Sequence, residues 1–315
     1  MKESGKIGLA SITTFIIGLL IGTYCITPAV TPQSPQQTFS EDIAWRYQSI
    51  RIVGSTTVLP IANACAIKFM QLYPTVTITV EGGGSGRGYS ELIDGICDIA
   101  DASRPPKPRE LELAEQKGVH FVLHEIAIDG IAIIVHPSVT EKLNGSLNLT
   151  LEEIGKIFAG YYKKWNEVRE GLPNEEIIVF VREHGSGTRA TFEEFCMEPF
   201  GLKVKPGAME VPSNPAMLQS VKQTPYSIGY IGLGFITSDI EVVHVGKSEK
   251  GPFYAATYDN VKRGVYPISR FLYMVTNGVP ESGSLIDRFI DFVKSPVGQT
   301  IVEQCGYIAV YPKEG

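Results

Sequence analysis

The stretch RIVGSTTVLP, residues 51–60, places a short β-type run directly before a loop of small hydroxyl residues and the start of a helix. Arg51–Val53 is predicted as a strand. Pro60 suits the first turn of a helix, where its missing N–H would have no intrahelical partner. Apolar residues at helical spacing follow from Ile61 to Phe69. The order strand, glycine–hydroxyl loop, helix is the unit from which much of the chain is built.

The same alternation of strands and helices continues to the C-terminus. Near-continuous apolar runs are typical of buried strands, and 3.6-residue spacing with Pro near the start and Gly past the end is typical of helices. The expected strands are Thr75–Val80, Ile126–Val135 and Ile177–Val181, and the expected helices are Thr188–Cys196, Ser284–Val293 and Pro296–Cys305. This alternation predicts an α/β fold with mostly parallel sheets.

The N-terminal segment differs in kind from the rest of the chain. Lys2 and Lys6 precede a run from Ile7 to Ile26 without a charged residue, long enough to span a bilayer as a helix. We therefore expect residues 1–26 to be a signal-anchor transmembrane segment and 27–45, rich in Pro, Gln, Ser and Thr, to be a flexible linker. The chain beyond would be extracytoplasmic and anchored to the cell membrane. The alternative is a cleaved signal and a secreted or periplasmic protein.

Composition narrows the function. A net charge of −6 is opposite to the basic balance of nucleic-acid binders, so no nucleic-acid partner is expected. No cysteine pair or Cys/His cluster has metal-ligand spacing, so neither a metal nor another cofactor is expected. An exterior location would permit disulfides, whose pairing the sequence leaves open, among Cys65, Cys97, Cys196 and Cys305.

Four loops place glycine or hydroxyl residues between a strand and a helix. They are VGSTTVLP (53–60), EGGGSGRG (81–88), DIADASR (98–104) and VREHGSGTR (181–189). Helix N-termini present unpaired backbone N–H groups and partial positive charge, and glycines let those groups converge on a ligand. Arginine adds a planar fork that engages two oxygens of an oxyanion. Four such loops in one chain predict an anion-binding site.

Nucleotide-binding loops fit the glycine-rich segment poorly. The lysine of a P-loop is missing, with Arg87 nearest to it, and no glycine triplet has the G-x-G-x-x-G spacing of dinucleotide-binding folds. His184 is interpreted as a surface or supporting residue rather than a catalytic base. No catalytic residue is assigned.

The four loops, in this order and at these separations, resemble the phosphate-binding receptors (PstS) of phosphate ABC importers, over about residues 50–312. The resemblance implies a two-lobed periplasmic-binding-protein fold of type II, α/β in class, with a hinge and a ligand cleft between the lobes. Lobe I would comprise residues 46–129 plus 267–315, and lobe II residues 130–266. The implied partners are inorganic phosphate and the permease subunits of the importer, and the receptor is expected to be a monomer.

Carried over by position, the family's ligand-binding residues fall on all four loops. The implied phosphate ligands are Ser55, Thr56, Thr57, Ser85, Ser103, Arg104, Arg182, Ser186, Gly187 and Thr188. Some members of the family have an aspartate at the position of Ser103, where it accepts the proton of the bound phosphate. In this chain Asp101, Glu81 or the Ser103 hydroxyl would have to accept that proton.

Three other functions remain open at this stage. A receptor for sulfate, molybdate or tungstate would use a similar site, although sites for fully ionised oxyanions can dispense with arginine. A phosphate sensor would share every site residue. An enzyme acting on phosphate esters would need a metal-binding set, an activated nucleophile or a P-loop, none of which the sequence indicates.

Overall fold

The computed structural model describes residues 44–311. The predicted transmembrane segment and almost all of the predicted linker therefore lie outside the described residues. Within the described part, no helix is both long and apolar enough to cross a membrane.

Twelve strands form the framework of this part of the chain. They are β1 (Ser49–Gly54), β2 (Thr77–Glu81), β3 (Ile99–Ala102), β4 (Phe121–Val135), β5 (Asn148–Thr150), β6 (Ile178–Arg182), β7 (Met209–Val211), β8 (Ser227–Gly232), β9 (Glu241–Val242), β10 (His244–Gly246), β11 (Phe253–Tyr254) and β12 (Ser269–Asn277). Most belong to one sheet with the order β2-β1-β3-β12-β4-β8-β6-β7, in which β9 also pairs with β4. The strands β11, β10 and β5 form a small second sheet.

Helices follow most of the strands. They are α2 (Leu59–Leu72), α3 (Ser85–Ile93), α4 (Pro108–Gln116), α5 (Leu151–Phe158), α6 (Trp165–Val168), α7 (Gly187–Cys196), α8 (Asn214–Gln223), α9 (Tyr258–Lys262), α10 (Leu285–Lys294) and α11 (Pro296–Gln304), with the 3₁₀ helices η1 (Trp45–Tyr47), η2 (Pro137–Val139), η3 (Glu198–Phe200) and η4 (Leu233–Phe235). The predicted strands and helices agree with this assignment within two residues at each end, except that β4 begins five residues before the predicted strand Ile126–Val135.

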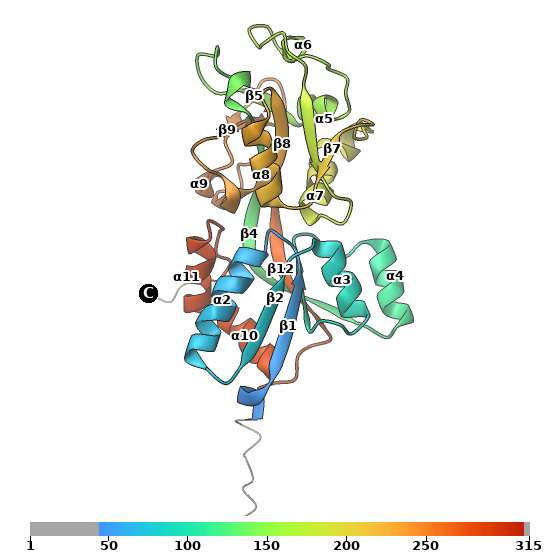
Figure 1. Cartoon of the computed structure of the whole chain (residues 1–315), viewed down its shortest axis with the longest axis vertical. Helices are drawn as coiled ribbons and strands as arrows, with labels where there is room; N and C mark the ends of the chain where they lie inside the picture. The colour runs from blue at the N-terminus through green and yellow to red at the C-terminus, as the bar shows by residue number, and fades with distance from the viewer. Residues whose placement is uncertain (1–43, 312–315) are drawn as a thin grey trace, which may run out of the picture. The chain divides into compact units, whose positions relative to one another are not determined.

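The strands β4 and β12 join the two halves of the main sheet. Residues 121–130 of β4 pair with β12, and residues 131–135 pair with β8. Figure 1 shows β4 and β12 running side by side between the two halves. Both strands pair antiparallel with their neighbours, so the sheet is mixed, and the prediction of a mostly parallel sheet was wrong. The reason is that the chain passes from one half to the other along β4 and returns along β12.

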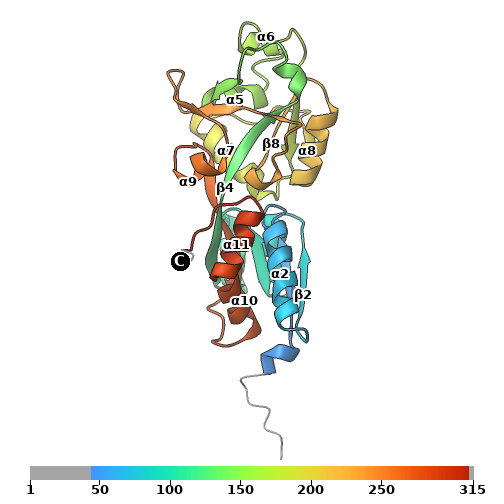
Figure 2. The ribbon, with the colours of Figure 1, turned by 90° about the vertical axis from the view of Figure 1, so that its left-hand side faces the viewer.

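Each half has a hydrophobic core of its own. We call the half around β1, β2 and β3 lobe I and the half around β6, β7 and β8 lobe II. In lobe I, α2, α10 and α11 pack together against one face of the sheet (Figure 2), and α3 covers the other face. In lobe II, α7 and α8 lie on opposite faces of β8, because Phe192 stacks on Tyr230 at 4.2 Å while Met217 packs against Gly229.

Candidate functional site

Three of the predicted loops lie where a strand ends and a helix begins. Residues 55–58 connect β1 to α2, residues 82–84 connect β2 to α3, and residues 183–186 connect β6 to α7. The fourth loop begins at Ser103, directly after β3, and β3 lies between β1 and β12 in the sheet. Three helix N-termini therefore lie at these loops, and the first backbone N–H groups of a helix are donors of the kind that an anion site uses.

Gly187 brings the loop of lobe II against two serines of lobe I. A Cβ atom at this position would lie 2.2 Å from Ser103 Oγ and 2.6 Å from Ser85 Oγ, distances that no side chain tolerates. The two serine hydroxyls lie 3.3 Å apart, and Ser85 Oγ also accepts a hydrogen bond from the Ser103 N–H. A second contact between the lobes runs from the Gly86 N–H to the Gly185 carbonyl, at 3.0 Å. Glycine is thus required here for close approach.

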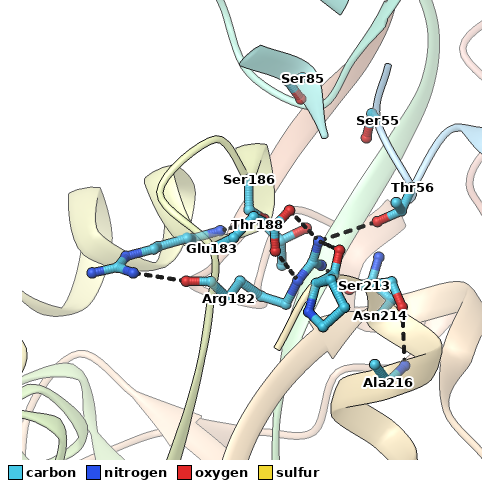
Figure 3. A network of polar contacts seen from close by, with 12 residues as sticks. Ser55, Thr56, Ser85, Arg182, Glu183, Ser186, Thr188, Ser213, Asn214 and Ala216 are labelled. Carbon is cyan, nitrogen blue, oxygen red and sulfur yellow. Dashed lines mark hydrogen bonds and ion pairs between the residues drawn. The ribbon is translucent and has the colours of Figure 1, made fainter. Parts of the chain in front are cut away.

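The threonines of the two lobes meet directly. Thr57 Oγ1 and Thr188 Oγ1 lie 3.0 Å apart, and both residues are almost completely buried. Ser55 and Ser186 flank them: Ser55 Oγ accepts from the Thr57 N–H, and Ser186 Oγ caps α7 by accepting from the Arg189 N–H. Figure 3 shows Ser55 and Ser85 opposite Ser186 and Thr188.

Arg182, the last residue of β6, places its guanidinium among these groups. Its side chain is 1% exposed, and Nη2 donates to Thr56 Oγ1 in lobe I at 3.2 Å (Figure 3). Nε and Nη2 also hold the carboxylate of Glu183, at 3.0 and 2.9 Å. A cation with a neighbouring carboxylate as its internal partner can exchange that partner for an anionic ligand.

Arg104 is placed differently from the other predicted residues. Its guanidinium forms two hydrogen bonds of 2.7 Å with the Glu110 carboxylate and stacks over the Tyr89 ring at 5.2 Å. Of the three guanidinium nitrogens of Arg104, only Nε is buried without a hydrogen-bond partner among the described residues. The guanidinium is therefore paired within its own lobe, and its contact with the ligand stays a prediction.

Sequence reasoning missed a second buried arginine of the site. Arg270, on β12, lies directly opposite Asp129 on β4 and binds its carboxylate through Nε and Nη2, at 3.1 and 2.7 Å. Its Nη2 also donates to Thr57 and Thr188, and its Nη1 donates to the Ser103 carbonyl. Burial raises the pKa of Asp129, and the Arg270 guanidinium opposes that rise. The available signal was an aspartate inside the apolar run 126–135, since buried charges are normally paired.

Asn214, at the start of α8, was also missed. Its Nδ2 donates to Thr57 Oγ1 at 2.9 Å, and its Oδ1 accepts from Arg182 Nη1 at 3.1 Å. The side chain is completely buried. In the sequence, Ser213-Asn-Pro indicates only a helix start, and Ser213 Oγ does cap α8.

The two carboxylates considered as proton acceptors differ in environment. Glu81 forms ion pairs with Arg51 and Arg87, at 3.0 and 2.8 Å, so it is already engaged. Asp101 is completely buried, and neither carboxylate oxygen has a hydrogen-bond partner within residues 44–311. Burial raises the pKa of Asp101 well above its ordinary value of 3.8, which favours the protonated carboxyl group.

We expect Asp101→Asn to stabilise the protein, and to do so more strongly at higher pH. The folded chain keeps a proton on Asp101 that the unfolded chain releases above pH 3.8, so stability falls by about 1.4 kcal/mol per pH unit until the raised pKa is reached. The asparagine keeps the shape and does not titrate. Urea unfolding at about pH 4.5 and pH 8 measures this, with the exposed Asp291→Asn as control. Equal stability differences at both pH values would contradict the expectation.

Cys65, Cys97, Cys196 and Cys305 are all free, and burial raises the pKa of Cys65 and Cys97 to about 12. No group of three His, Cys, Asp or Glu residues that could hold a metal ion lies within residues 44–311.

The comparisons with known proteins agree with this architecture. A family model described as the PBP superfamily domain matches residues 30–297, so the two-lobed α/β fold is that of this superfamily. The phosphate-binding protein PstS of Pseudomonas aeruginosa is 30% identical over 97% of this chain and 95% of its own. PstS of Bacillus subtilis is 31% identical over 83% of this chain and 81% of its own. The chain therefore belongs to the family of the phosphate-binding proteins PstS, and the resemblance predicted from the four loops is confirmed.

Solved structures point the same way. A phosphate ABC transporter substrate-binding protein of Clostridium perfringens, determined with bound phosphate, is 33% identical, with a TM-score of 0.70 over 84% of this chain and 100% of its own. An ABC-type phosphate transport receptor of Vibrio cholerae is 30% identical, with a TM-score of 0.63 over 82% of this chain and 99% of its own.

Proposed function

We propose that this protein is an extracytoplasmic receptor that binds inorganic phosphate between its two lobes and delivers it to the permease of an ABC importer. The observation that carries the proposal is that Thr57 and Thr188 meet between the two lobes, while the buried guanidinium of Arg182 in lobe II donates to Thr56 in lobe I. The names of the relatives and of the Clostridium perfringens structure support phosphate as the ligand.

The proposed ligand set is the one that the family resemblance implies. It comprises Ser55, Thr56, Thr57, Ser85, Ser103, Arg104, Arg182, Ser186, Gly187 and Thr188. All ten residues lie on the four loops, but the Arg104 guanidinium is turned to Glu110. Lobe I comprises residues 46–129 and 267–315, lobe II comprises 130–266, and the hinge lies where β4 changes partner from β12 to β8. Closure of the lobes around the anion would present the liganded form to the permease.

The protein acts as a monomeric receptor without catalysis, held at the membrane by residues 1–26. The supporting features are the uncharged run from Ile7 to Ile26 and the lysines before it. Density-gradient flotation of the full-length protein with membranes, compared with a chain beginning at Ser40, tests the anchor. An equal distribution of both forms would contradict it.

Titration calorimetry with phosphate, repeated in the presence of sulfate, tests the ligand. We expect phosphate to bind with 1:1 stoichiometry and a hundredfold excess of sulfate to leave the affinity unchanged within about threefold. Discrimination is expected because a site built to pair with a protonated oxygen leaves a polar group unpaired when sulfate binds. Equal affinities for the two anions would overturn the assignment to phosphate and leave a general oxyanion receptor.

A further inference from the structure

The hydroxyls of Thr57 and Thr188 form a pair whose hydrogen-bonding capacity can be counted atom by atom. Each hydroxyl oxygen has two lone pairs and carries one hydrogen, and the two oxygens lie 3.0 Å apart. One hydrogen of Arg270 Nη2 goes to Asp129 Oδ2, at 2.7 Å, so its other hydrogen is shared between the two threonine oxygens, with Nη2 3.3 Å from Thr57 and 3.0 Å from Thr188. A guanidinium can only donate, so it occupies one lone pair on each threonine.

Asn214 supplies a further donor whose direction is fixed. Its Oδ1 receives hydrogen bonds from Arg182 Nη1 at 3.1 Å and from the Gly232 N–H at 3.4 Å, and both of those groups can only donate. If the Asn214 amide were rotated by 180°, its NH₂ group would face the N–H groups of Arg182 and Gly232, and donors would oppose donors. Nδ2 is therefore the atom that lies 2.9 Å from Thr57 Oγ1, and it donates to that oxygen.

The count then leaves one hydrogen over. Thr57 accepts from Arg270 and Asn214, which fills its two lone pairs, so its own hydrogen goes to Thr188. Thr188 accepts from Thr57 and Arg270, which fills its lone pairs as well. The hydrogen of Thr188 has no acceptor in the hydrogen bonds found among residues 44–311.

We infer that Arg270 and Asn214 make the Thr57–Thr188 pair an obligatory donor at the ligand site. The pair gives one hydrogen bond to an unprotonated oxygen of the bound oxyanion, and it has no lone pair left to accept one from a protonated oxygen. Arg270 and Asn214 act as positioning residues, through the threonines. The inference rests on the proposed function, because it assumes an oxyanion between the two lobes.

The arrangement determines how hydrogen phosphate is oriented. Its P–OH group must face another part of the site. At this pair all the hydroxyl lone pairs already accept hydrogen bonds, so the P–OH hydrogen would be buried without an acceptor. The pair therefore reads the protonation state of a single ligand oxygen. It does so independently of whichever group accepts the phosphate proton.

A double-mutant cycle on phosphate affinity tests the inference by titration calorimetry. Thr188→Val removes the proposed donor and should weaken phosphate binding at least tenfold. Asn214→Asp puts an acceptor in place of the fixed donor, so the hydrogen of Thr57 turns to the new carboxylate. Thr188 then donates to Thr57, and no hydrogen remains for the anion. In the Asn214→Asp variant, adding Thr188→Val should lower the phosphate affinity less than threefold. If Asn214 had a purely structural role, the affinity losses of the two single substitutions would multiply in the double variant.

Matched variants keep the result interpretable. Thr188→Ser keeps the hydroxyl and should bind within about threefold of the wild type, and Thr79→Val at an exposed position of β2 should leave the affinity unchanged. If Asn214→Asp fails to fold, Arg270→Lys, which keeps a charge opposite Asp129, is combined with Thr188→Val in a second cycle. We again expect Thr188→Val to lower the phosphate affinity less in the variant than in the wild type. Multiplicative effects with normal phosphate binding by the wild type overturn this inference alone. A wild-type protein that binds no oxyanion overturns the proposed function and the inference together.

Discussion

Arg182→Ala is expected to weaken phosphate binding by at least about 2 kcal/mol, or roughly thirtyfold, because a charge-assisted hydrogen bond in a water-excluded place is lost. The guanidinium is 1% exposed and is held by Glu183, Asn214 and Thr56, so its position is set before any ligand arrives. Preorganised donors contribute more to binding than mobile ones, since no side-chain entropy is lost on association. Titration calorimetry measures the loss directly.

Two further variants separate charge from geometry at this position. Arg182→Lys keeps a positive charge but not the planar fork, so we expect an intermediate loss. Arg169→Ala removes an arginine from a surface ion pair with Glu153 in the same lobe and should leave the affinity unchanged. An affinity of Arg182→Ala within experimental error of the wild type would remove Arg182 from direct contact with the anion.

The loops could be predicted from the sequence because their signals are local. A strand period followed by glycine and hydroxyl residues and then a helix period is contained within about ten residues, as in 51–60. The structure places Thr57 and Thr188 in contact although they are 131 residues apart, and no local pattern shows that distance. The family resemblance implied that both residues bind the ligand, and their direct contact was not predicted.

The residues that sequence reasoning missed depend on strand register. Arg270 and Asp129 are directly opposite on antiparallel strands, but that register follows from which two strands cross between the lobes. The expectation of a mostly parallel sheet also hid it, because antiparallel neighbours were not considered. Asn214 was missed for another reason: its helix-start motif has an ordinary structural interpretation, and only the fold brings its amide to Thr57.

Asp129→Asn is expected to lower the free energy of unfolding by about 3 kcal/mol, because it leaves the Arg270 guanidinium buried without a counter-charge. The Asp129 side chain is 0% exposed and that of Arg270 is 6% exposed, so water replaces little of the lost interaction. Asparagine keeps the shape and one acceptor for the Leu233 N–H, which confines the change to the charge. Urea unfolding at neutral pH measures it, with the surface variant Asp94→Asn, expected to cost under about 1 kcal/mol, as control.

Replacing both Asp129 and Arg270 is expected to destabilise the protein less than replacing Asp129 alone. Asp129→Leu combined with Arg270→Met removes both buried charges, and apolar side chains of similar size restore most of the lost stability. Phosphate affinity should not recover with it, because Thr57 and Thr188 lose their shared donor. Stability and binding therefore separate in the double variant if Arg270 serves the site, whereas a pair that served the hinge alone would restore both.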